Sequence, residues 1–183
     1  MMRSLDSYIY DMLRLSNEGD SATYEIVIDL MRFITHLGDL ILLVFISIIT
    51  LVALIRQKFY KIGLFWTVTV LFSFLFSAGL KKLIGMERPD DIYHLVEATS
   101  AAMPSGHALK STVVYFGLYL LLMRVFRFSK AGKIWTKLLC LMPFLIGSSR
   151  IFLGIHWPSD VLAGWCLGAL ISLVFYRFIL SHS

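Results

Sequence analysis

The stretch SRIFLGIHWPSD, residues 149–160, decides how this chain is interpreted, because it sets ionisable side chains among apolar sequence. Arg150 and His156 lie six positions apart, and Asp160 follows His156 by four. Ionisable groups near membrane depth are costly and tend to be kept for function. A guanidinium suits phosphate, and a nearby carboxylate can hold a histidine in one tautomer as a base or nucleophile. The stretch therefore indicates phosphate chemistry at a membrane surface.

The composition around this stretch is that of an integral membrane protein. Of 183 residues, 58% are hydrophobic and 16% are charged, and the mean hydropathy is +0.77. An ordinary soluble domain is about 45–50% apolar and about 25% charged. The net charge of +5 does not predict a nucleic-acid partner, because the basic residues lie in short loops between apolar runs. The lipid bilayer is the expected surrounding, and the sequence does not set an oligomeric state.

Five apolar runs are candidate membrane spans, and most approach the roughly 20 residues that a bilayer core requires. They cover residues 37–55, 62–80, 105–123, 134–148 and 160–180, and the fourth is short enough that we expect it to extend into residues 150–153. Two amphipathic pieces precede them, at residues 5–14 and 24–34, and both are too polar to span, so we expect helices at the interface. The expected fold is an all-α integral membrane helical bundle of about five to six transmembrane helices with N-terminal interfacial helices.

Two smaller features fit this picture. Cys140 and Cys166 lie inside apolar runs and are predicted to be packing residues rather than a disulfide or metal pair. The N-terminus interrupts its apolar stretch with Asp6 and Asp11, so no cleavable signal peptide is predicted. Membrane insertion is then expected to depend on the internal spans.

The distribution of charge orients the expected spans. Only basic charges occupy the turns after the first and third spans and the end of the fifth: Arg56, Lys58, Lys61, Arg124, Arg127, Lys130, Lys133, Lys137 and Arg177. If the spans alternate in direction, these residues share one side and every Asp and Glu lies on the other. The positive-inside rule makes the basic side cytoplasmic. We expect a multi-pass protein of the cell (inner or cytoplasmic) membrane.

The same alternation brings three polar motifs to the extracytoplasmic face. The second span ends at Lys81, and Arg88 follows in the next loop; the third span begins with PSGH, residues 104–107; and the opening stretch joins the last two spans. Together, Lys81, Arg88 and Arg150 suit a dianionic phosphoryl group whose charge spreads over its equatorial oxygens.

Two of these cations have ordinary alternatives when taken singly. Lys81 or Lys82 could place its ammonium at the interface from the end of a helix. Arg88 could be a loop residue that pairs with Asp90 or Asp91.

The tetrapeptide PSGH, residues 104–107, is typical of a helix start. Proline is pre-organised for the first helical turn, and Gly106 permits close approach of a ligand. The free N–H groups and the positive end of the helix dipole attract an anion, to which Ser105 can add a hydroxyl donor. A simple capping role would also explain this tetrapeptide.

His107 and His156 are the two histidines placed for chemistry. One must attack phosphorus as neutral imidazole while the other protonates the leaving oxygen. Asp160 favours His156 as the nucleophile, because the carboxylate would hold one ring nitrogen protonated and stabilise the charge that develops. Pro158 argues against a continuous helix, so we expect His156 in a loop and Asp160 in the first turn that follows. His107 is then the expected general acid.

Metal binding is the competing use of these His and Asp side chains. The chain has no HExxH motif, no cysteine pair and few carboxylates near the motifs. Arg and Lys at the same place would repel a cation. We therefore predict a site without a metal or other cofactor.

The three motifs resemble the signature of the type-2 phosphatidic acid phosphatase (PAP2) superfamily of membrane lipid phosphatases. That signature reads Lys-x6-Arg-Pro, Pro-Ser-Gly-His and Ser-Arg-x5-His-x3-Asp; every position has a counterpart here in the same order, and the spacing selects Lys81 over Lys82. The resemblance implies an all-helical bundle that hydrolyses its substrate without a metal, through a phosphohistidine on His156 with His107 as the acid. It implies a phosphate cradle made of Lys81, Arg88, Ser105, Gly106 and Arg150.

The resemblance also implies a class of substrate. In related small bacterial members the substrates are undecaprenyl diphosphate, phosphatidylglycerol phosphate, phosphatidate or lipid A phosphates. A small chain with an outward-facing site suits recycling of a polyprenyl diphosphate carrier, so undecaprenyl diphosphate is the expected substrate. On this interpretation residues 1–35 form an N-terminal interfacial segment and residues 36–183 a PAP2-like transmembrane catalytic domain.

Several alternatives remain open. Within enzymes they are a phosphatidylglycerophosphate, phosphatidate or lipid A phosphatase, and a lipid phosphotransferase that uses the same phosphohistidine. Outside enzymes they are a lipid transporter, which no inverted repeat supports, and a catalytically silent scaffold, which usually lacks one of the His or Asp residues that are present here.

One further cation lies outside the signature. Lys110 follows His107 by one helical turn and should face roughly the same side of the helix. We hypothesise that it contacts a second phosphate or a polar headgroup. The alternative is an ion pair with Asp39 or another outer carboxylate.

Overall fold

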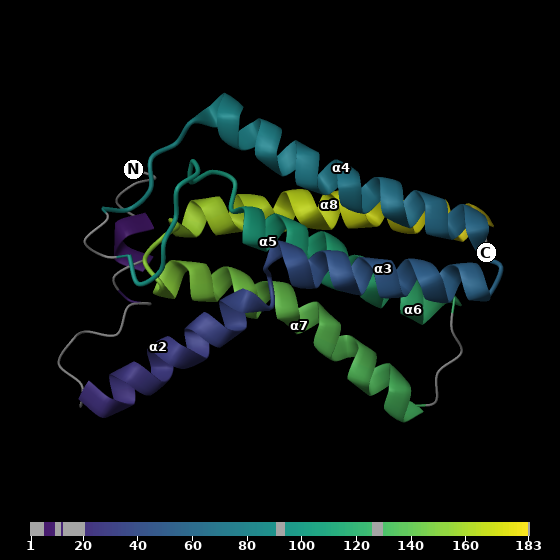
Figure 1. Ribbon diagram of the computed structural model, residues 1–183, viewed down its shortest axis with the longest axis horizontal. Coiled ribbons are helices and arrows are strands. Elements are labelled where there is room, and N and C mark those ends of the chain that lie inside the picture. Colours follow the sequence, from purple (N-terminus) through teal and green to yellow (C-terminus); the bar gives the residue numbers. More distant parts are fainter. Residues whose placement is uncertain (1–5, 10–11, 13–20, 91–93, 126–129, 183) are drawn as a thin grey trace.

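In the computed structural model, long helices pack side by side into an elongated bundle (Figure 1). The structure describes residues 6–9, 12, 21–90, 94–125 and 130–182. Its helices are α2 (Ser21–His36), α3 (Leu40–Arg56), α4 (Tyr60–Ile84), α5 (Gly106–Ser111), the π-helical η2 (Thr112–Phe116), α6 (Gly117–Val125), α7 (Lys130–Phe152) and α8 (Pro158–His182). No strand occurs in these described ranges, and the predicted all-α membrane fold is confirmed.

The apolar runs form helices because a backbone in lipid must satisfy its hydrogen bonds within the segment. The α4 helix ends at Gly85, whose left-handed conformation (φ 60°) lets its N–H donate to the Lys81 carbonyl oxygen. Inside the bundle, Trp66 of α4 and Phe175 of α8 are almost completely buried, with ring centroids 5.4 Å apart. These aromatic contacts hold α4 and α8 together along the bundle.

Among the described residues, three helices are long and apolar enough to cross a membrane: Tyr60–Ile84, Gly106–Val125 and Pro158–Ile179. The pair Ala22–His36 and Leu40–Arg56, bent by 44°, would add a fourth if it counted as one span. Alone, α3 has 17 residues, slightly fewer than the roughly 20 that a bilayer core requires. Several spans are therefore present, and the count of five to six stays a prediction.

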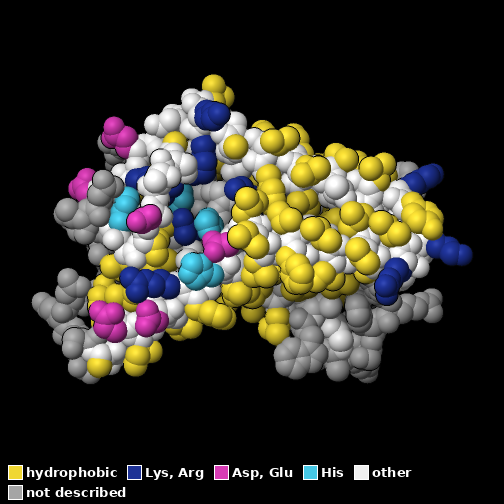
Figure 2. Space-filling model, in the orientation of Figure 1, with side chains coloured by type: hydrophobic (Ala, Val, Ile, Leu, Met, Phe, Trp, Pro, Cys, Tyr) yellow, Lys and Arg dark blue, Asp and Glu magenta, His cyan; other side chains and the backbone are white. Residues whose placement is uncertain are grey.

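The two ends of the bundle differ in charge. Figure 2 shows a belt of hydrophobic side chains along the bundle, with acidic and histidine side chains gathered at the end where α2 lies. Leu64, Leu75 and Ile41 are among the large apolar side chains that this belt exposes. On the face shown, only basic side chains carry charge at the opposite end of the belt. Such an arrangement suits a bilayer around the middle and water at both ends.

The predicted interfacial helix at residues 24–34 is present as α2. It diverges from the bundle axis and packs against α7 (Figure 1). Its surface mixes exposed Ile26 and Phe33 with an exposed ion pair, in which Arg32 Nη1 lies 3.3 Å from Asp29 Oδ1. Half of the other predicted piece, residues 5–14, lies outside the described residues, and residues 6–9 and 12 are helical. Whether residues 1–35 form a separate segment stays a prediction.

A close contact between α5 and α8 brings two distant motifs together. A Cβ atom on Gly164 would lie 2.8 Å from the Ser105 carbonyl oxygen and 3.1 Å from the Leu109 nitrogen, so only glycine allows the two backbones to approach this closely. The Ser105 N–H donates to the Asp160 carbonyl oxygen at 2.9 Å. The PSGH tetrapeptide and the 149–160 stretch are thereby fixed to each other at one end of the bundle.

Candidate active site

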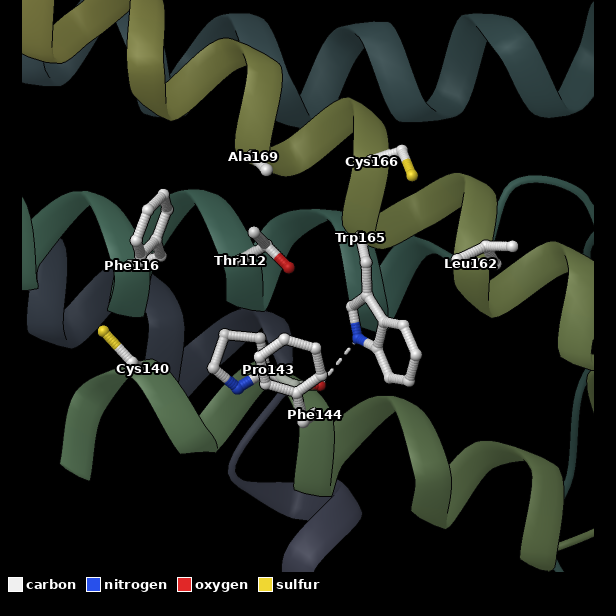
Figure 3. Close-up of a pocket in the computed structure, with 9 residues that line it drawn as sticks. All are labelled: Thr112, Phe116, Cys140, Pro143, Phe144, Leu162, Trp165, Cys166 and Ala169. Carbon is white, nitrogen blue, oxygen red and sulfur yellow. Dashed lines mark hydrogen bonds between the residues drawn. The ribbon is translucent and has the colours of Figure 1, made fainter. Parts of the chain in front are cut away.

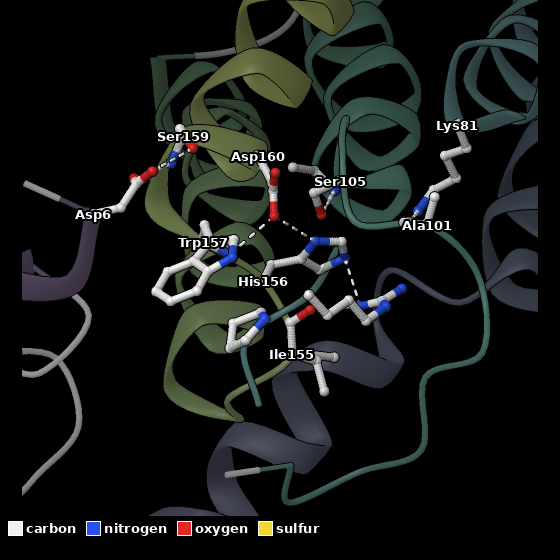
Figure 4. Close-up of polar contacts among 12 residues, drawn as sticks. Asp6, Lys81, Ala101, Ser105, Ile155, His156, Trp157, Ser159 and Asp160 are labelled. Carbon is white, nitrogen blue, oxygen red and sulfur yellow. Dashed lines mark hydrogen bonds and ion pairs between the residues drawn. The ribbon is translucent and has the colours of Figure 1, made fainter. Parts of the chain in front are cut away.

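His156 lies in the loop between α7 and α8 and is held from both sides (Figure 4). Its Nδ1 is 3.3 Å from Asp160 Oδ2, and its Nε2 is 3.4 Å from Arg88 Nη1. A guanidinium can only donate, so Nε2 must be the acceptor and Nδ1 must carry the proton that Asp160 accepts. The ring is therefore neutral with its Nε2 lone pair toward Arg88. The predicted places of His156 in a loop and Asp160 in the first turn of α8 are confirmed.

Burial and charge both keep His156 neutral. The side chain is 2% exposed, and burial lowers the pKa of His156 well below its ordinary value, assisted by the positive charges of Arg88, Arg150 and Lys81. Asp160 Oδ2 also accepts the Trp157 backbone N–H at 2.9 Å, which fixes the carboxylate beneath the imidazole. The result is an imidazole whose free nitrogen is available at neutral pH.

Arg88 is tied to backbone carbonyls, which aims its guanidinium at His156. Its Nε donates to the Ser100 carbonyl oxygen at 2.7 Å, and its Nη1 donates to the Ile155 carbonyl oxygen. Among the described residues these contacts, rather than an ion pair with Asp90, hold the side chain; Asp91 lies outside the described ranges. Arg88 is thus fixed by the chain around the site.

Lys81 reaches the same loop from the last turn of α4. Its Nζ donates to the Ala101 carbonyl oxygen and lies 3.3 Å from Ser100 Oγ, which also lies 3.3 Å from Arg88 Nη2. Lys82 is exposed. The two signature cations therefore meet at Ser100, a residue that the sequence interpretation did not single out.

The PSGH tetrapeptide starts a helix, although not in the predicted register. The helix begins at Gly106, and Ser105 is its N-cap in an extended conformation, with Oγ accepting the Ala108 N–H at 3.5 Å. The prediction that Pro104 occupies the first turn is wrong, because Ser105 takes the cap position after it. A Cβ on Gly106 would lie 3.4 Å from both Lys81 Cε and Ser77 Oγ, so glycine lets Lys81 lie against the helix start.

Arg150 lies in the last turn of α7, as expected if the short fourth span extends beyond residue 148. It is 8% exposed, its Nη1 donates to Thr35 Oγ1 at 3.0 Å, and its Nε has no hydrogen-bond partner among the described residues. A buried guanidinium with an unused donor is a costly feature unless it binds something. An anion in the site would satisfy it.

His107 is paired with a carboxylate that the sequence interpretation did not assign to the site. Its Nε2 is 3.1 Å from Asp39 Oδ1, and Asp39 Oδ2 is 2.7 Å from His36 Nδ1. Asp39 lies between α2 and α3. The sequence signal that could have pointed to Asp39 was its position three residues after His36, at the start of an apolar run. Because the Ser105 N–H donates to the Asp160 carbonyl oxygen, the motifs that carry His107 and His156 lie at the same end of the bundle.

Lys110 lies on the same side of α5 as the signature residues. Its Nζ is 5.4 Å from the centroid of the Phe74 ring, a cation–π distance. Its Cε would lie 3.7 Å from a Cβ on Gly106, near Lys81. In the described part of the chain no carboxylate forms an ion pair with Lys110, and Asp39 is paired with the two histidines instead.

The residue types around the site suit an anion. In the described residues, no group of three or more His, Cys, Asp or Glu is arranged to hold a metal ion. Three cationic side chains surround His156 and add positive charge to its surroundings. That the reaction needs no metal stays a prediction.

A separate cavity lies between α7, α8 and the middle of the bundle (Figure 3). It has a volume of about 320 Å³ and is lined by Thr112, Phe116, Cys140, Pro143, Phe144, Leu162, Trp165, Cys166 and Ala169. Cys140 and Cys166 are both free, and Trp165 Nε1 donates to the Pro143 carbonyl oxygen at 2.9 Å. With no charged side chain in its lining, this cavity suits hydrocarbon rather than phosphate.

Comparison with known proteins identifies relatives of this arrangement. The family model described as PAP2 superfamily matches residues 62–182. A phosphatidylglycerophosphatase B of Bacillus subtilis (strain 168) is 34% identical over 145 residues, which cover 78% of this chain and 70% of that protein. An undecaprenyl-diphosphatase of Sulfolobus acidocaldarius is 30% identical over 132 residues, or 69% of this chain and 59% of that protein.

A lipid A 1-phosphatase of Rhizobium johnstonii is 34% identical over 125 residues, and the match spans 62% of this chain but only 46% of that protein. Among solved structures, the transmembrane PAP2 type phosphatidylglycerolphosphate phosphatase from Bacillus subtilis superposes with a TM-score of 0.86 at 27% identity, covering all of this chain and 88% of the other. Aquifex aeolicus LpxE shares the fold, with a TM-score of 0.66 at 20% identity over 94% of this chain and 95% of the other.

Proposed function

Because this chain belongs to the PAP2 superfamily, whose phosphatases hydrolyse phosphoric esters, we propose that it removes a phosphate from a membrane lipid through a phosphohistidine on His156. One observation carries the proposal: Nδ1 of this buried imidazole faces Asp160 while Nε2 faces Arg88. Asp160 contacts the imidazole on the side away from the attacking nitrogen, and Arg88 lies beside that nitrogen, where it would bind a phosphoryl oxygen.

In the first step, Nε2 of His156 forms a bond to phosphorus as the bond from phosphorus to the leaving oxygen breaks. The bonding electrons go to that oxygen, and His107 donates a proton to it. Asp160 accepts the Nδ1–H hydrogen bond throughout and stabilises the positive charge that develops on the ring. The products are a phosphohistidine and the lipid alcohol, or the lipid monophosphate when the substrate is a diphosphate.

In the second step, neutral His107 takes a proton from a water that attacks phosphorus. The bond between phosphorus and Nε2 breaks, inorganic phosphate leaves, and both histidines return to their starting states. An alcohol in place of water would complete a phosphotransfer by the same route, which is the alternative activity of such a site.

The phosphoryl oxygens would be held by the cations and donors at the start of α5. We assign Lys81, Arg88, Ser105, Gly106 and Arg150 to this cradle. The unused Nε of Arg150 and the guanidinium of Arg88 offer charge-assisted hydrogen bonds to an oxyanion. Because backbone carbonyls already fix Arg88, little reorganisation is needed as charge spreads over the equatorial oxygens.

For the substrate we propose a lipid diphosphate of the polyprenyl type, with undecaprenyl diphosphate as the specific choice. Lys110 and the buried hydroxyl of Ser77 support a second phosphate, because both lie beside Gly106 and neither hydrogen-bonds to another described side chain. The relative from Sulfolobus acidocaldarius is an undecaprenyl-diphosphatase.

Phosphatidylglycerophosphate is the second candidate substrate. The Bacillus subtilis relative covers the larger share of this chain and is a phosphatidylglycerophosphatase B. The headgroup of phosphatidylglycerophosphate also carries a phosphodiester near the terminal phosphate, and Lys110 would contact that phosphodiester in place of the second phosphate of a diphosphate. Lipid A and phosphatidate are further lipid phosphates that the same cradle would accept.

We propose that the site faces the extracytoplasmic side of the cell membrane. Arg56, Lys61 and Arg124 lie at the opposite end of their helices from the catalytic loop. Short basic loops favour the cytoplasm. Blocking the site with an impermeant phosphate analogue, added to intact cells and to inverted vesicles, tests this orientation.

Phosphate release by the purified full-length protein in detergent tests the activity. Undecaprenyl diphosphate, phosphatidylglycerophosphate and phosphatidate are compared with and without a divalent-cation chelator. We expect release from at least one lipid with chelator present. No release from any of the lipids, or full dependence on a divalent ion, contradicts the proposal.

Substitution of Lys110 tests the diphosphate preference. Because a hydrogen bond to a charged group contributes about 1.5–3 kcal/mol, Lys110→Met should lower kcat/KM on the diphosphate by about 10- to 100-fold. The loss on a monophosphate of the same lipid should be much smaller. Lys82→Met, an exposed lysine in the same region, is the matched control, and an equal loss on both lipids removes Lys110 from recognition.

A further inference from the structure

We infer that Asp39, in the turn between α2 and α3, positions His107 as the proton donor of the reaction, in the way that Asp160 positions His156. The inference rests on the proposed function and adds to it a residue that precedes the region matched by the family model, residues 62–182. It also gives the N-terminal helix pair a part in the chemistry.

The contacts form a short chain from the surface to the catalytic helix. His36 Nδ1 is 2.7 Å from Asp39 Oδ2, and Asp39 Oδ1 is 3.1 Å from His107 Nε2. The exposed fraction of the side chains falls along this chain, from 70% at His36 to 44% at Asp39 and 25% at His107. Asp39 therefore bridges an exposed imidazole and a largely buried one.

The turn also fixes how the His107 ring is rotated. A Cβ on Gly38 would lie 3.0 Å from His107 Cδ2 and 2.6 Å from Ile146 Cγ2, so the turn packs directly against the edge of the ring that carries Cδ2 and Nε2. With Nε2 on Asp39, Nδ1 is the nitrogen left for the substrate. This arrangement assigns the transferred proton to Nδ1 and the retained proton to Nε2.

Charges near the pair support an ionised Asp39. The hydrogen bonds from His36 and His107, with their charges, lower the pKa of Asp39 although burial alone would raise it. Around His107 itself lie two cations, Arg150 of α7 and Lys110 of α5. Asp39 is the negative group that offsets them, so without it His107 would give up its proton more readily to water and donate it less often to substrate.

The chemistry predicts a dependence on the leaving group. When the bond from phosphorus breaks, an alkoxide depends strongly on receiving a proton, whereas nitrophenolate and a phosphate monoester are weaker bases and depend on one much less. A carboxylate that serves the proton donor should therefore matter most for an alkyl phosphate. A purely structural role would lower the activity on all substrates together.

The experiment compares Asp39→Asn with the unmodified protein on two substrates. One is dioctanoyl phosphatidate, with a basic alkoxide leaving group, and the other is p-nitrophenyl phosphate. Proton donation contributes roughly 10²- to 10⁴-fold, of which positioning is one part, so we expect kcat/KM on phosphatidate, which reports formation of the phosphohistidine, to fall about 10- to 100-fold. On p-nitrophenyl phosphate the expected loss is less than about threefold.

Three comparisons keep the test decisive. Asp29→Asn, which removes an exposed carboxylate of α2 that contacts only Arg32 in the described structure, should leave both activities unchanged. Asp39→Glu should recover part of the phosphatidate activity. The Asp39 side chain makes no capping hydrogen bond to α3, so thermal unfolding should be little changed in Asp39→Asn.

Two results would overturn the inference: an equal loss on both substrates, or unchanged or increased activity on phosphatidate. Either would show that Asp39 has a structural role or restrains His107 in the resting state. The proposed function fails separately, if the unmodified protein hydrolyses neither substrate.

Discussion

The site contains two aspartate–histidine pairs, and they are built in different ways. His156 and Asp160 are four residues apart at the start of one helix, and their side chains are 2% and 0% exposed. His107 and Asp39 are 68 residues apart, belong to different helices, and have side chains that are 25% and 44% exposed. The residues of the first pair are close in sequence and buried from solvent. Those of the second pair are brought together by tertiary packing at the partly exposed edge of the site.

The difference matches the two roles that we propose. A nucleophile must stay neutral and keep one orientation, which burial and a neighbouring carboxylate both favour. A proton donor must lose and regain a proton in each turnover, which a half-exposed position permits. The contrast implies that substitutions in the His156–Asp160 pair should lower activity more than substitutions in the His107–Asp39 pair.

Removing each imidazole should give the largest effects and the clearest contrast. His156→Ala should abolish turnover, a loss of about 10⁴-fold or more, because the phosphoenzyme cannot form. His107→Ala should lose about 10²- to 10⁴-fold on phosphatidate and less on p-nitrophenyl phosphate, whose leaving group needs little help from a proton donor. The measurement is kcat/KM for phosphate release, which reports the step that forms the phosphohistidine.

Chemical trapping distinguishes the two variants further. After denaturation, acid-labile phosphate should remain on His107→Ala incubated with p-nitrophenyl phosphate, because formation of the phosphohistidine outpaces its hydrolysis. None should remain on His156→Ala. Acid-labile phosphate on His156→Ala would instead make His107 the nucleophile and His156 the proton donor.

Removing each carboxylate should give the next largest effects. Asp160→Asn should lower kcat about 10²- to 10³-fold on every substrate and leave a small remainder, since the imidazole loses the partner that fixes its tautomer. This loss should exceed that of Asp39→Asn, because Asp160 is completely buried and contacts the imidazole that attacks phosphorus. Equal losses, or a dependence of Asp160→Asn on the leaving group, would contradict the distinction between the pairs.

The smallest expected effect is on how the free energy of unfolding depends on pH. The pKa of folded His156 is lowered by burial and nearby cations, so below about pH 6.5 the unfolded chain binds a proton that the folded chain does not. Stability should fall as the pH drops from 7 to 5, by up to about 2 kcal/mol from this group. His156→Gln should flatten that fall in thermal unfolding measured in detergent.

Asp39 should act in a different pH range. Its pKa is also lowered, so its contribution is present above its ordinary pKa of about 3.9 and is lost only at more acidic pH. Asp39→Asn should therefore leave the change between pH 7 and 5 intact. The assignment of the fall in stability between pH 7 and 5 to His156 is wrong if Asp39→Asn flattens that fall, or if His156→Gln leaves it unchanged.

Much of the fold follows from the sequence because membrane helices are long, apolar and locally determined. The predicted runs 62–80 and 160–180 lie within α4 (Tyr60–Ile84) and α8 (Pro158–His182). Sequence was less informative about helix ends. Pro104 precedes α5 instead of starting it, because Ser105 caps the helix, whereas the extension of α7 through Arg150 agrees with the expected extension of the fourth span.

The first aspartate–histidine pair could be predicted and the second could not, for a physical reason. A separation of four residues around a helix start places His156 and Asp160 together without knowledge of the rest of the chain. No spacing rule relates Asp39 to His107, or Thr35 to Arg150, because the packing of α2 and α3 against α5 and α7 brings them together. The motif residues are thus visible in sequence, and their supports are visible only in three dimensions.

The attachment of Arg88 to the Ser100 and Ile155 carbonyl oxygens has a consequence for sequence drift. Main-chain oxygens are supplied by any amino acid, so position 155 can change identity without loss of a contact to the guanidinium, and a change at position 100 removes only the contact through Ser100 Oγ. Asp39 supports His107 through a side chain and has no such freedom. A chimera that exchanges the first two helices between relatives would therefore alter proton delivery while leaving the phosphate clamp intact.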